Sequence, residues 1–134
     1  MPTHIAPMLA VRDAAAAIAF YQAAFGATVS WRLGGGHVVA GLEIDGAPFF
    51  LATESPDNGT RGPTAATGTT VRIELFVDDP TAVQARAIRA GATEKDPVRE
   101  HAHETHGPRP IHRMLQGAVF DPAGHMWLIG KFLD

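Results

Sequence analysis

A degenerate internal repeat constrains the fold of this chain more than any other feature of its sequence. The segment Leu9–Thr28, LAVRDAAAAIAFYQAAFGAT, returns in altered form at Leu75–Thr93, LFVDDPTAVQARAIRAGAT. Each copy begins with an L-x-V run typical of a strand, continues into a helix preceded by aspartate, and ends in G-A-T, where the glycine suits a helix C-terminus. The chain therefore has two related halves, and we expect its function where the halves face each other.

Each copy of the repeat is followed by patterns that predict three further strands. Turn signals separate them, among them Asp45-Gly46 and the tight turn Asp121–Gly124. The polar, irregular segment 100–110 is expected to be a loop or a broken strand pair. The strands expected in this way are 28–33, 37–44 and 47–53 in the first half, and 93–99, 111–120 and 125–132 in the second.

A segment rich in Gly, Pro, Ser and Thr separates the halves. We therefore divide a single domain, 1–134, into a first module at 1–54, a linker at 55–69 and a second module at 70–134. Helical spacing assigns Tyr21 and Phe25 to the core. Trp127 is assigned to the core as well, and His125 to the turn before the last strand.

Composition limits the classes of function. The chain has 134 residues, enough for one domain, with a formal net charge of -3 and no cysteine. This balance argues against nucleic-acid binding, and no apolar run approaches the ~20 residues of a membrane-spanning helix. The lack of cysteine excludes disulfides and thiolate metal sites. No secretory leader pattern is visible, so we expect a cytoplasmic protein.

Three motifs carry a family resemblance: L-x-V-x-D at Leu9–Asp13, A-x-x-F-Y-x-x-x-F-G-A at Ala17–Ala27, and D-P-x-G-H-x-W at Asp121–Trp127. Together they resemble the vicinal oxygen chelate superfamily of glyoxalases, bleomycin resistance proteins and extradiol dioxygenases, and the last two are similar to its PhnB-like branch. The resemblance implies an α+β fold of two tandem β-α-β-β-β modules. It further implies that each module curls its sheet into a half-barrel, so that the two form a curled, partly open mixed sheet around a cavity. Helices on the outer faces and a homodimer are implied as well.

The resemblance also points to four inward positions where metal-dependent members place His or Glu, because a divalent ion needs nitrogen and oxygen ligands that converge from opposite strands. Carried over by position, this chain offers Ala6, Phe50, Arg72 and Leu128. Two aliphatic residues, an aromatic ring and a cation do not ligate a metal. We therefore expect no family metal and no other cofactor.

A histidine-rich segment provides an alternative metal site. His101 and His103 are two residues apart and would share one face of a strand, where both could chelate a divalent ion. The same segment contains glycine and proline, so solvated histidines in a loop are the simpler interpretation.

Arg72 and Glu74 should both point into the cavity, because alternate residues of a strand lie on one face. Two explanations fit such charges on an apolar strand. They form an internal ion pair, or Arg72 binds a carboxylate or other anion of a ligand while Glu74 acts as acceptor or base. The ligand-binding residues expected in this cavity are Arg72, Glu74, Trp31, Phe50, Phe76 and Met114.

These observations favour a protein that binds a small organic ligand between its modules without the family metal. The alternative is a metal-dependent enzyme of the same superfamily, either a glyoxalase-type lyase or isomerase or a dioxygenase. Glu74 is the catalytic candidate. Two questions stay open: whether any reaction is catalysed, and whether the modules pair within one chain or between chains.

Overall fold

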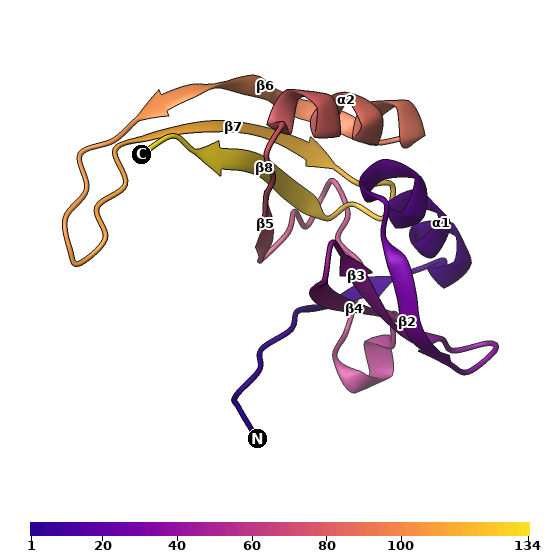
Figure 1. The fold of residues 1–134 in the computed structure, drawn as a ribbon. Coiled ribbons are helices and arrows are strands. Elements are labelled where there is room, and N and C mark those ends of the chain that lie inside the picture. Colours follow the sequence, from indigo (N-terminus) through magenta and orange to yellow (C-terminus); the bar gives the residue numbers. More distant parts are fainter.

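The protein is described here by a computed structural model of residues 1–134, which contains two similar modules joined by a linker (Figure 1). The linker 55–69 contains a short 3-10 helix, η1 (Pro56–Asn58). The α+β fold with two tandem β-α-β-β-β modules is thereby confirmed. The first module consists of β1 (Met8–Val11), α1 (Ala14–Phe25), β2 (Thr28–Leu33), β3 (Val39–Ile44) and β4 (Ala47–Thr53), and the second of β5 (Arg72–Phe76), α2 (Pro80–Ala90), β6 (Thr93–Ala102), β7 (Arg113–Phe120) and β8 (Met126–Phe132).

Each module builds its own four-stranded mixed sheet, with strand order β1-β4-β3-β2 in the first and β5-β8-β7-β6 in the second. Each half therefore has a mixed sheet of its own, as the resemblance implied. The register repeats between them, because Leu9 pairs with Leu51 as Leu75 pairs with Ile129. Phe50, next to Leu51, consequently occupies the position in β4 that Leu128 occupies in β8.

Both helices begin and end as the repeat predicts. The Asp13 carboxylate accepts a hydrogen bond from the Ala16 N–H at 3.0 Å, and the Asp79 carboxylate accepts one from the Ala82 N–H at 3.1 Å. Caps of this kind stabilise a helix by about 1 kcal/mol each. Gly26 ends α1 at a φ of 67°, a left-handed conformation that costs glycine little.

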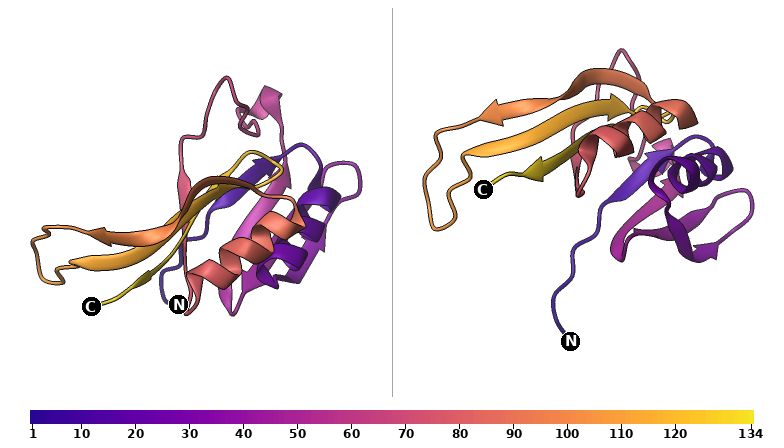
Figure 2. Two further views of the ribbon diagram at one scale, coloured as in Figure 1. Left: turned by 90° about the horizontal axis from the view of Figure 1, so that it is seen from above. Right: turned by 45° about the horizontal axis from the view of Figure 1, so that its top comes forward.

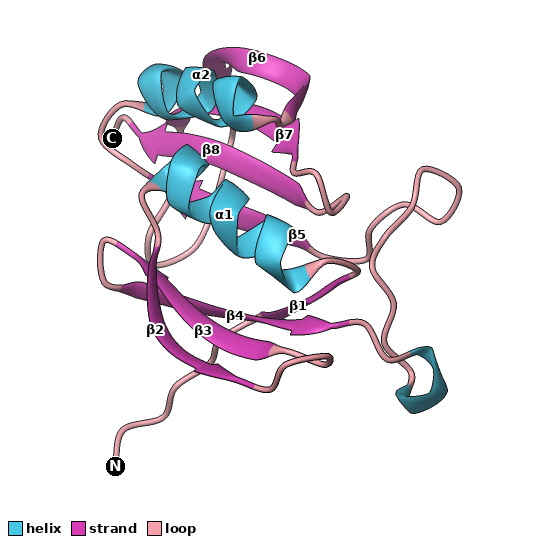
Figure 3. Ribbon diagram, turned by 90° about the vertical axis from the view of Figure 1, so that its right-hand side faces the viewer, coloured by secondary structure: helices cyan, strands magenta, loops and turns pink.

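The helices lie between the two sheets, and Figure 3 shows α1 with strands of both modules on either side of it. Trp127 of the second module fills the interior, with its ring centroid 5.5 Å from Tyr21, 4.9 Å from Phe25 and 5.5 Å from Phe49. The helix-facing sides of both sheets thus share one core. The expectation of helices on the outer faces is wrong for a single chain, because α1 and α2 pack against each other between the two sheets.

The opposite side of each sheet, which we call its open face, consequently points outward. The first open face carries Met8, Trp31 and Phe50, and the second carries Arg72 and Glu74. Within one chain the two open faces do not enclose the cavity that the sequence led us to expect. A cavity lined by both open faces would require an arrangement in which these faces lie opposite each other.

The hairpin of β6 and β7 extends away from the helices (Figure 2). Strand β6 runs to Ala102, which pairs with Arg113, so residues 100–102 belong to a strand and the loop begins at 103. An ion pair between Arg113 Nε and Glu100 Oε1, 2.6 Å apart, joins the two strands. Alternation failed to predict this extension because none of residues 100–102 is buried, so no apolar face marks them as a strand. Neither helix of the protein is long and apolar enough to cross a membrane.

Candidate functional site

A hollow of about 480 Å³ lies on the second open face. We call it the Arg72 hollow. It brings together Arg72, Glu74 and Met114, three of the six predicted ligand-binding residues. Its complete lining is Thr70, Val71, Arg72, Glu74, Met114, Gln116 and Leu128, all from the second module or the residues just before β5.

The charged groups of the hollow are not paired with each other. Gln116 Nε2 donates a hydrogen bond to Glu74 Oε1 at 3.1 Å, which fixes the carboxylate beside β7. The ion pairs of the chain are Arg12–Glu54, Lys95–Asp96, His112–Asp134 and Arg113–Glu100. The internal Arg72–Glu74 ion pair is therefore absent, and the Arg72 guanidinium keeps its donors free.

Trp31 and Phe50 lie together, but on the first open face. Trp31 pairs with Gly41, Gly41 pairs with Phe50 and Phe50 pairs with Met8, so one row crosses all four strands. The indole lies over Gly41, where an added Cβ would come within 2.3 Å of Trp31 Nε1. The Trp31 and Phe50 rings meet edge to face with centroids 5.2 Å apart.

Phe76 shares the sheet of the Arg72 hollow without lining it. Its ring stacks on Phe132 with centroids 4.5 Å apart, and the Arg109 guanidinium lies 5.6 Å from the centroid of Phe132. The prediction that all six residues line one cavity is thus wrong for a single chain. The helices between the sheets separate the aromatic pair Trp31–Phe50 from the polar hollow.

The residues present do not fit the metal of the superfamily. Ala6 precedes β1, Phe50 packs on Trp31, and Arg72 and Leu128 line the hollow. None of these side chains ligates a divalent ion. No three His, Asp or Glu side chains come together anywhere in the chain as a group that could hold a metal.

The alternative site at His101 and His103 is a pair of imidazole rings only. The rings are nearly parallel, at 4°, with centroids 6.2 Å apart. His101 Nε2 lies 3.3 Å from the Gln116 carbonyl oxygen, so this nitrogen already has a protein partner. No His, Asp or Glu side chain joins these two histidines as a third metal ligand.

The D-P-x-G-H-x-W motif forms the joint between the modules. The buried Asp121 carboxylate accepts hydrogen bonds from the Tyr21 hydroxyl and, at 2.9 Å, from Trp127 Nε1. Burial, followed by the adjacent negative charge of Asp121, raises the pKa of Tyr21 well above 10.0. His125 Nε2 donates to the Ala10 carbonyl oxygen at 2.7 Å. The sequence pattern assigns His125 to a turn and does not predict its contact with Ala10. The only sequence signal for a special role of His125 is its place in the D-P-x-G-H-x-W motif.

Residues 7–129 match the model of the glyoxalase-like domain. This chain therefore belongs to the glyoxalase-like domain family, within the superfamily that its motifs resemble. The family is compatible with more than one function, because its fold positions different sites in different members. The PhnB-like branch stays a prediction.

Several known proteins are similar to this chain. A protein of Mycobacterium bovis, named only as uncharacterized, is 36% identical over 133 residues, which cover 95% of this chain and 82% of the relative. A gene product of Arabidopsis thaliana superposes with a TM-score of 0.69 at 26% identity, covering 98% of this chain and 100% of the other. A glyoxalase-related enzyme of Fulvimarina pelagi superposes with a TM-score of 0.68 at 20% identity, covering 97% of this chain and 88% of the other. The last likeness concerns the fold alone.

Proposed function

We propose that this protein binds a small organic anion, without the family metal, between the Arg72 hollow of one copy and the first open face of a second copy. The observation that carries the proposal is the free guanidinium of Arg72 in a hollow of about 480 Å³. A hollow of this size falls in the range of small-molecule sites.

The chemistry of the hollow favours an anion with a hydrogen-bond donor. The planar guanidinium of Arg72 suits a carboxylate, which it can bind through two parallel hydrogen bonds. Glu74, held by Gln116, offers its second oxygen to a donor of the same ligand. Met114 and Leu128 supply apolar contact beside these polar groups.

A second copy would complete the site. Trp31 is 38% exposed and Met8 is 53% exposed, and both lie on the first open face with Phe50. Large apolar side chains gathered on one face are typical of an interface. Because the two modules are related in fold, the first open face of one copy can cover the second open face of another, and Trp31 would then stack on the ligand. A two-fold axis would form both contacts at once.

The alternative is a metal-dependent lyase, isomerase or dioxygenase. Its chemistry would need ligands where this chain has Ala6, Phe50, Arg72 and Leu128. No observation on the chain's own residues favours it. Binding without a family metal agrees with the residues present.

The proposal is tested with a panel of small mono- and dicarboxylates, followed by calorimetry on wild-type protein and two variants. Arg72→Ala should stay folded and bind the selected carboxylate about 10- to 100-fold more weakly, as expected when charged hydrogen bonds are lost. Arg89→Ala, an exposed arginine at the end of α2, is the matched control and should bind like wild type. Equal affinity for all three proteins would contradict the proposed role of Arg72.

Mixed dimers test whether two copies share the site. Trp31→Ala and Arg72→Ala proteins are each deficient in one half of it. A mixed dimer should contain one intact site, formed by Arg72 of the first variant and Trp31 of the second. Recovery of about half the wild-type binding capacity by the purified mixed dimer supports a shared site, whereas no recovery would contradict a site shared between two copies.

A further inference from the structure

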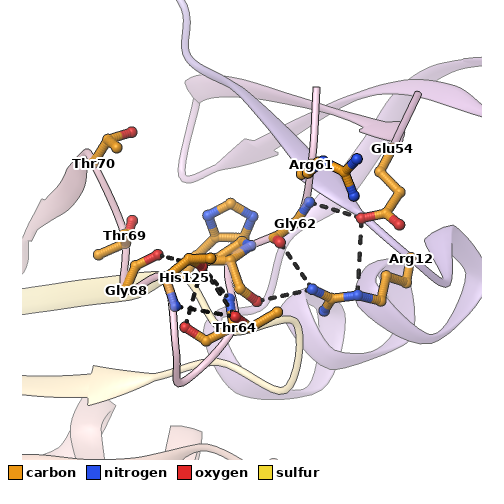
Figure 4. Close-up of a pocket in the computed structure, with 11 residues that line it drawn as sticks. Arg12, Glu54, Arg61, Gly62, Thr64, Gly68, Thr69, Thr70 and His125 are labelled. Atoms are coloured by element: carbon orange, nitrogen blue, oxygen red, sulfur yellow. Dashed lines mark hydrogen bonds and ion pairs between the residues drawn. The ribbon is translucent and has the colours of Figure 1, made fainter. Parts of the chain in front are cut away.

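A second pocket lies where the modules and the linker meet, and it shares Thr70 but no charged side chain with the Arg72 hollow. Figure 4 shows the side chains around it. We call it the joint pocket. Its volume is about 470 Å³ and no hydrophobic residue lines it. The lining consists of Arg12, Glu54, Arg61, Gly62, Pro63, Thr64, Thr67, Gly68, Thr69, Thr70 and His125.

The charge of the joint pocket is positive. Arg12 and Arg61 contribute two guanidinium groups, against the single carboxylate of Glu54. That carboxylate is already engaged, because Glu54 Oε1 accepts a hydrogen bond from the Gly62 N–H at 2.9 Å and lies 3.8 Å from Arg12 Nε. Arg61 makes no ion pair or side-chain hydrogen bond in the chain, so its donors are free for a ligand.

Both modules and the linker contribute to the joint pocket. Arg12 donates from Nη2 to the carbonyl oxygens of Gly62 at 2.8 Å and Pro63 at 3.1 Å, which holds the linker against the start of α1. His125 is buried and its Nε2 is bonded to Ala10. The other ring nitrogen, Nδ1, has no partner in the chain. A ligand here would therefore contact the first module, the linker and the second module together.

We propose that the joint pocket binds an oxyanion of the phosphate type. Guanidinium groups and hydroxyls are donors that match the oxygens of such an anion. The hydroxyls of Thr64, Thr67 and Thr69 already bond within the chain, so the free donors of the pocket are those of Arg61 and Thr70. Arg61 is its principal free cation and Thr70 adds a hydroxyl at its edge. The volume exceeds that of a bare phosphate, so a small phosphorylated molecule also fits.

Binding is measured with inorganic phosphate, by calorimetry and by thermal unfolding, against potassium chloride at equal ionic strength. Phosphate should raise the Tm of wild-type protein, because a ligand that binds only the folded state stabilises it. Arg61→Gln should weaken phosphate binding about tenfold or more without a loss of folding, because Arg61 has no partner in the chain. Arg89→Gln, an exposed arginine outside the pocket, should bind phosphate like wild type.

Three results would overturn the proposal. The absence of any phosphate effect beyond that of chloride would show that the pocket takes no phosphate. Equal affinity in Arg61→Gln and Arg89→Gln would indicate a general salt effect. Loss of phosphate binding in Arg72→Ala, with binding kept in Arg61→Gln, would assign the anion to the Arg72 hollow.

A comparison of inorganic phosphate with glycerol 3-phosphate separates two sources of the same chemistry. Tighter binding of the ester, lost in Arg61→Gln, identifies a phosphorylated small molecule as the occupant. Tighter binding of inorganic phosphate, lost in the same variant, identifies the free ion. Both results support an oxyanion site at the module joint and are independent of the carboxylate proposal.

Discussion

His125 donates a hydrogen bond from Nε2 to the Ala10 carbonyl oxygen, 2.7 Å away, and so ties the start of β8 to the end of β1. The two residues are far apart in sequence and belong to different modules. The buried carboxylate of Asp121 holds the His125 backbone N–H at 3.0 Å and therefore sets the ring in place. One short motif thus orients the second module on the first.

We expect His125→Ala to lower the free energy of unfolding by about 1–3 kcal/mol, because the Ala10 carbonyl loses its partner and the packing of the ring is lost. Urea denaturation at pH 7 measures the change. His106→Ala, in the exposed loop after β6, is the control and should stay within about 0.5 kcal/mol of wild type. Equal stability of the two variants would contradict the role assigned to His125.

We expect the Tyr21–Asp121 contact to make stability depend on pH at the alkaline end. The pKa of Tyr21 is raised in the folded state above the ordinary 10.0, chiefly by burial. The folded state therefore keeps a proton that the unfolded chain releases above about pH 10, so stability falls as the pH rises from there. Below pH 10 this contribution is fully present.

Tyr21→Phe isolates that contribution. The variant should be about 1–3 kcal/mol less stable at pH 7, because the buried Asp121 carboxylate loses a donor. Between pH 9 and 11 its stability should decline less steeply than that of wild type. Parallel denaturation midpoints of the two proteins across this range would refute the assignment.

Gly41→Ala should displace the Trp31 indole from the first open face. The added Cβ would come within 2.3 Å of Trp31 Nε1, far inside van der Waals contact, and the rigid ring cannot yield without moving. We expect a shift in tryptophan fluorescence and weaker ligand binding, with a loss of stability of about 1–3 kcal/mol. Gly36→Ala, where an added Cβ meets nothing within 4 Å, should leave all three measurements unchanged.

Elemental analysis of untagged protein should find no stoichiometric metal, and a chelator should leave the Tm unchanged. The physical reason is the set of side chains at the family positions, which contains no ligand for a divalent ion. Stoichiometric zinc, nickel, iron or manganese, with a lower Tm after its removal, would contradict the proposed metal-free binding. Glyoxalase and dioxygenase assays would then be the next measurements.

The fold could be read from the sequence because its signals are local. Asp13, Asp79 and Gly26 act on their own helices, and the hairpin at Asp45-Gly46 joins neighbouring strands. The matching positions of Phe50 and Leu128 also followed from hairpin offsets, because register propagates along paired strands.

The mutual placement of the modules could not be read in this way. It depends on contacts between distant residues, such as those of Trp127 with Phe49 and of His125 with Ala10. Alternation assigned Arg72 and Glu74 to the side of their sheet that faces away from the helix. No local pattern, however, predicts how the two sheets are oriented relative to each other. Arg61 was missed because a single exposed arginine in a linker has no periodicity to mark it.

The outward orientation of the open faces affects stoichiometry. Each chain carries two complementary halves, so the proposed pairing has two geometries. A two-fold axis closes the assembly with two equivalent ligand sites per pair, whereas a head-to-tail arrangement that fails to close would extend into filaments. For a closed pair, the apparent ligand affinity should fall when the protein is diluted below the dissociation constant of the dimer. Separated chains retain only half of each site.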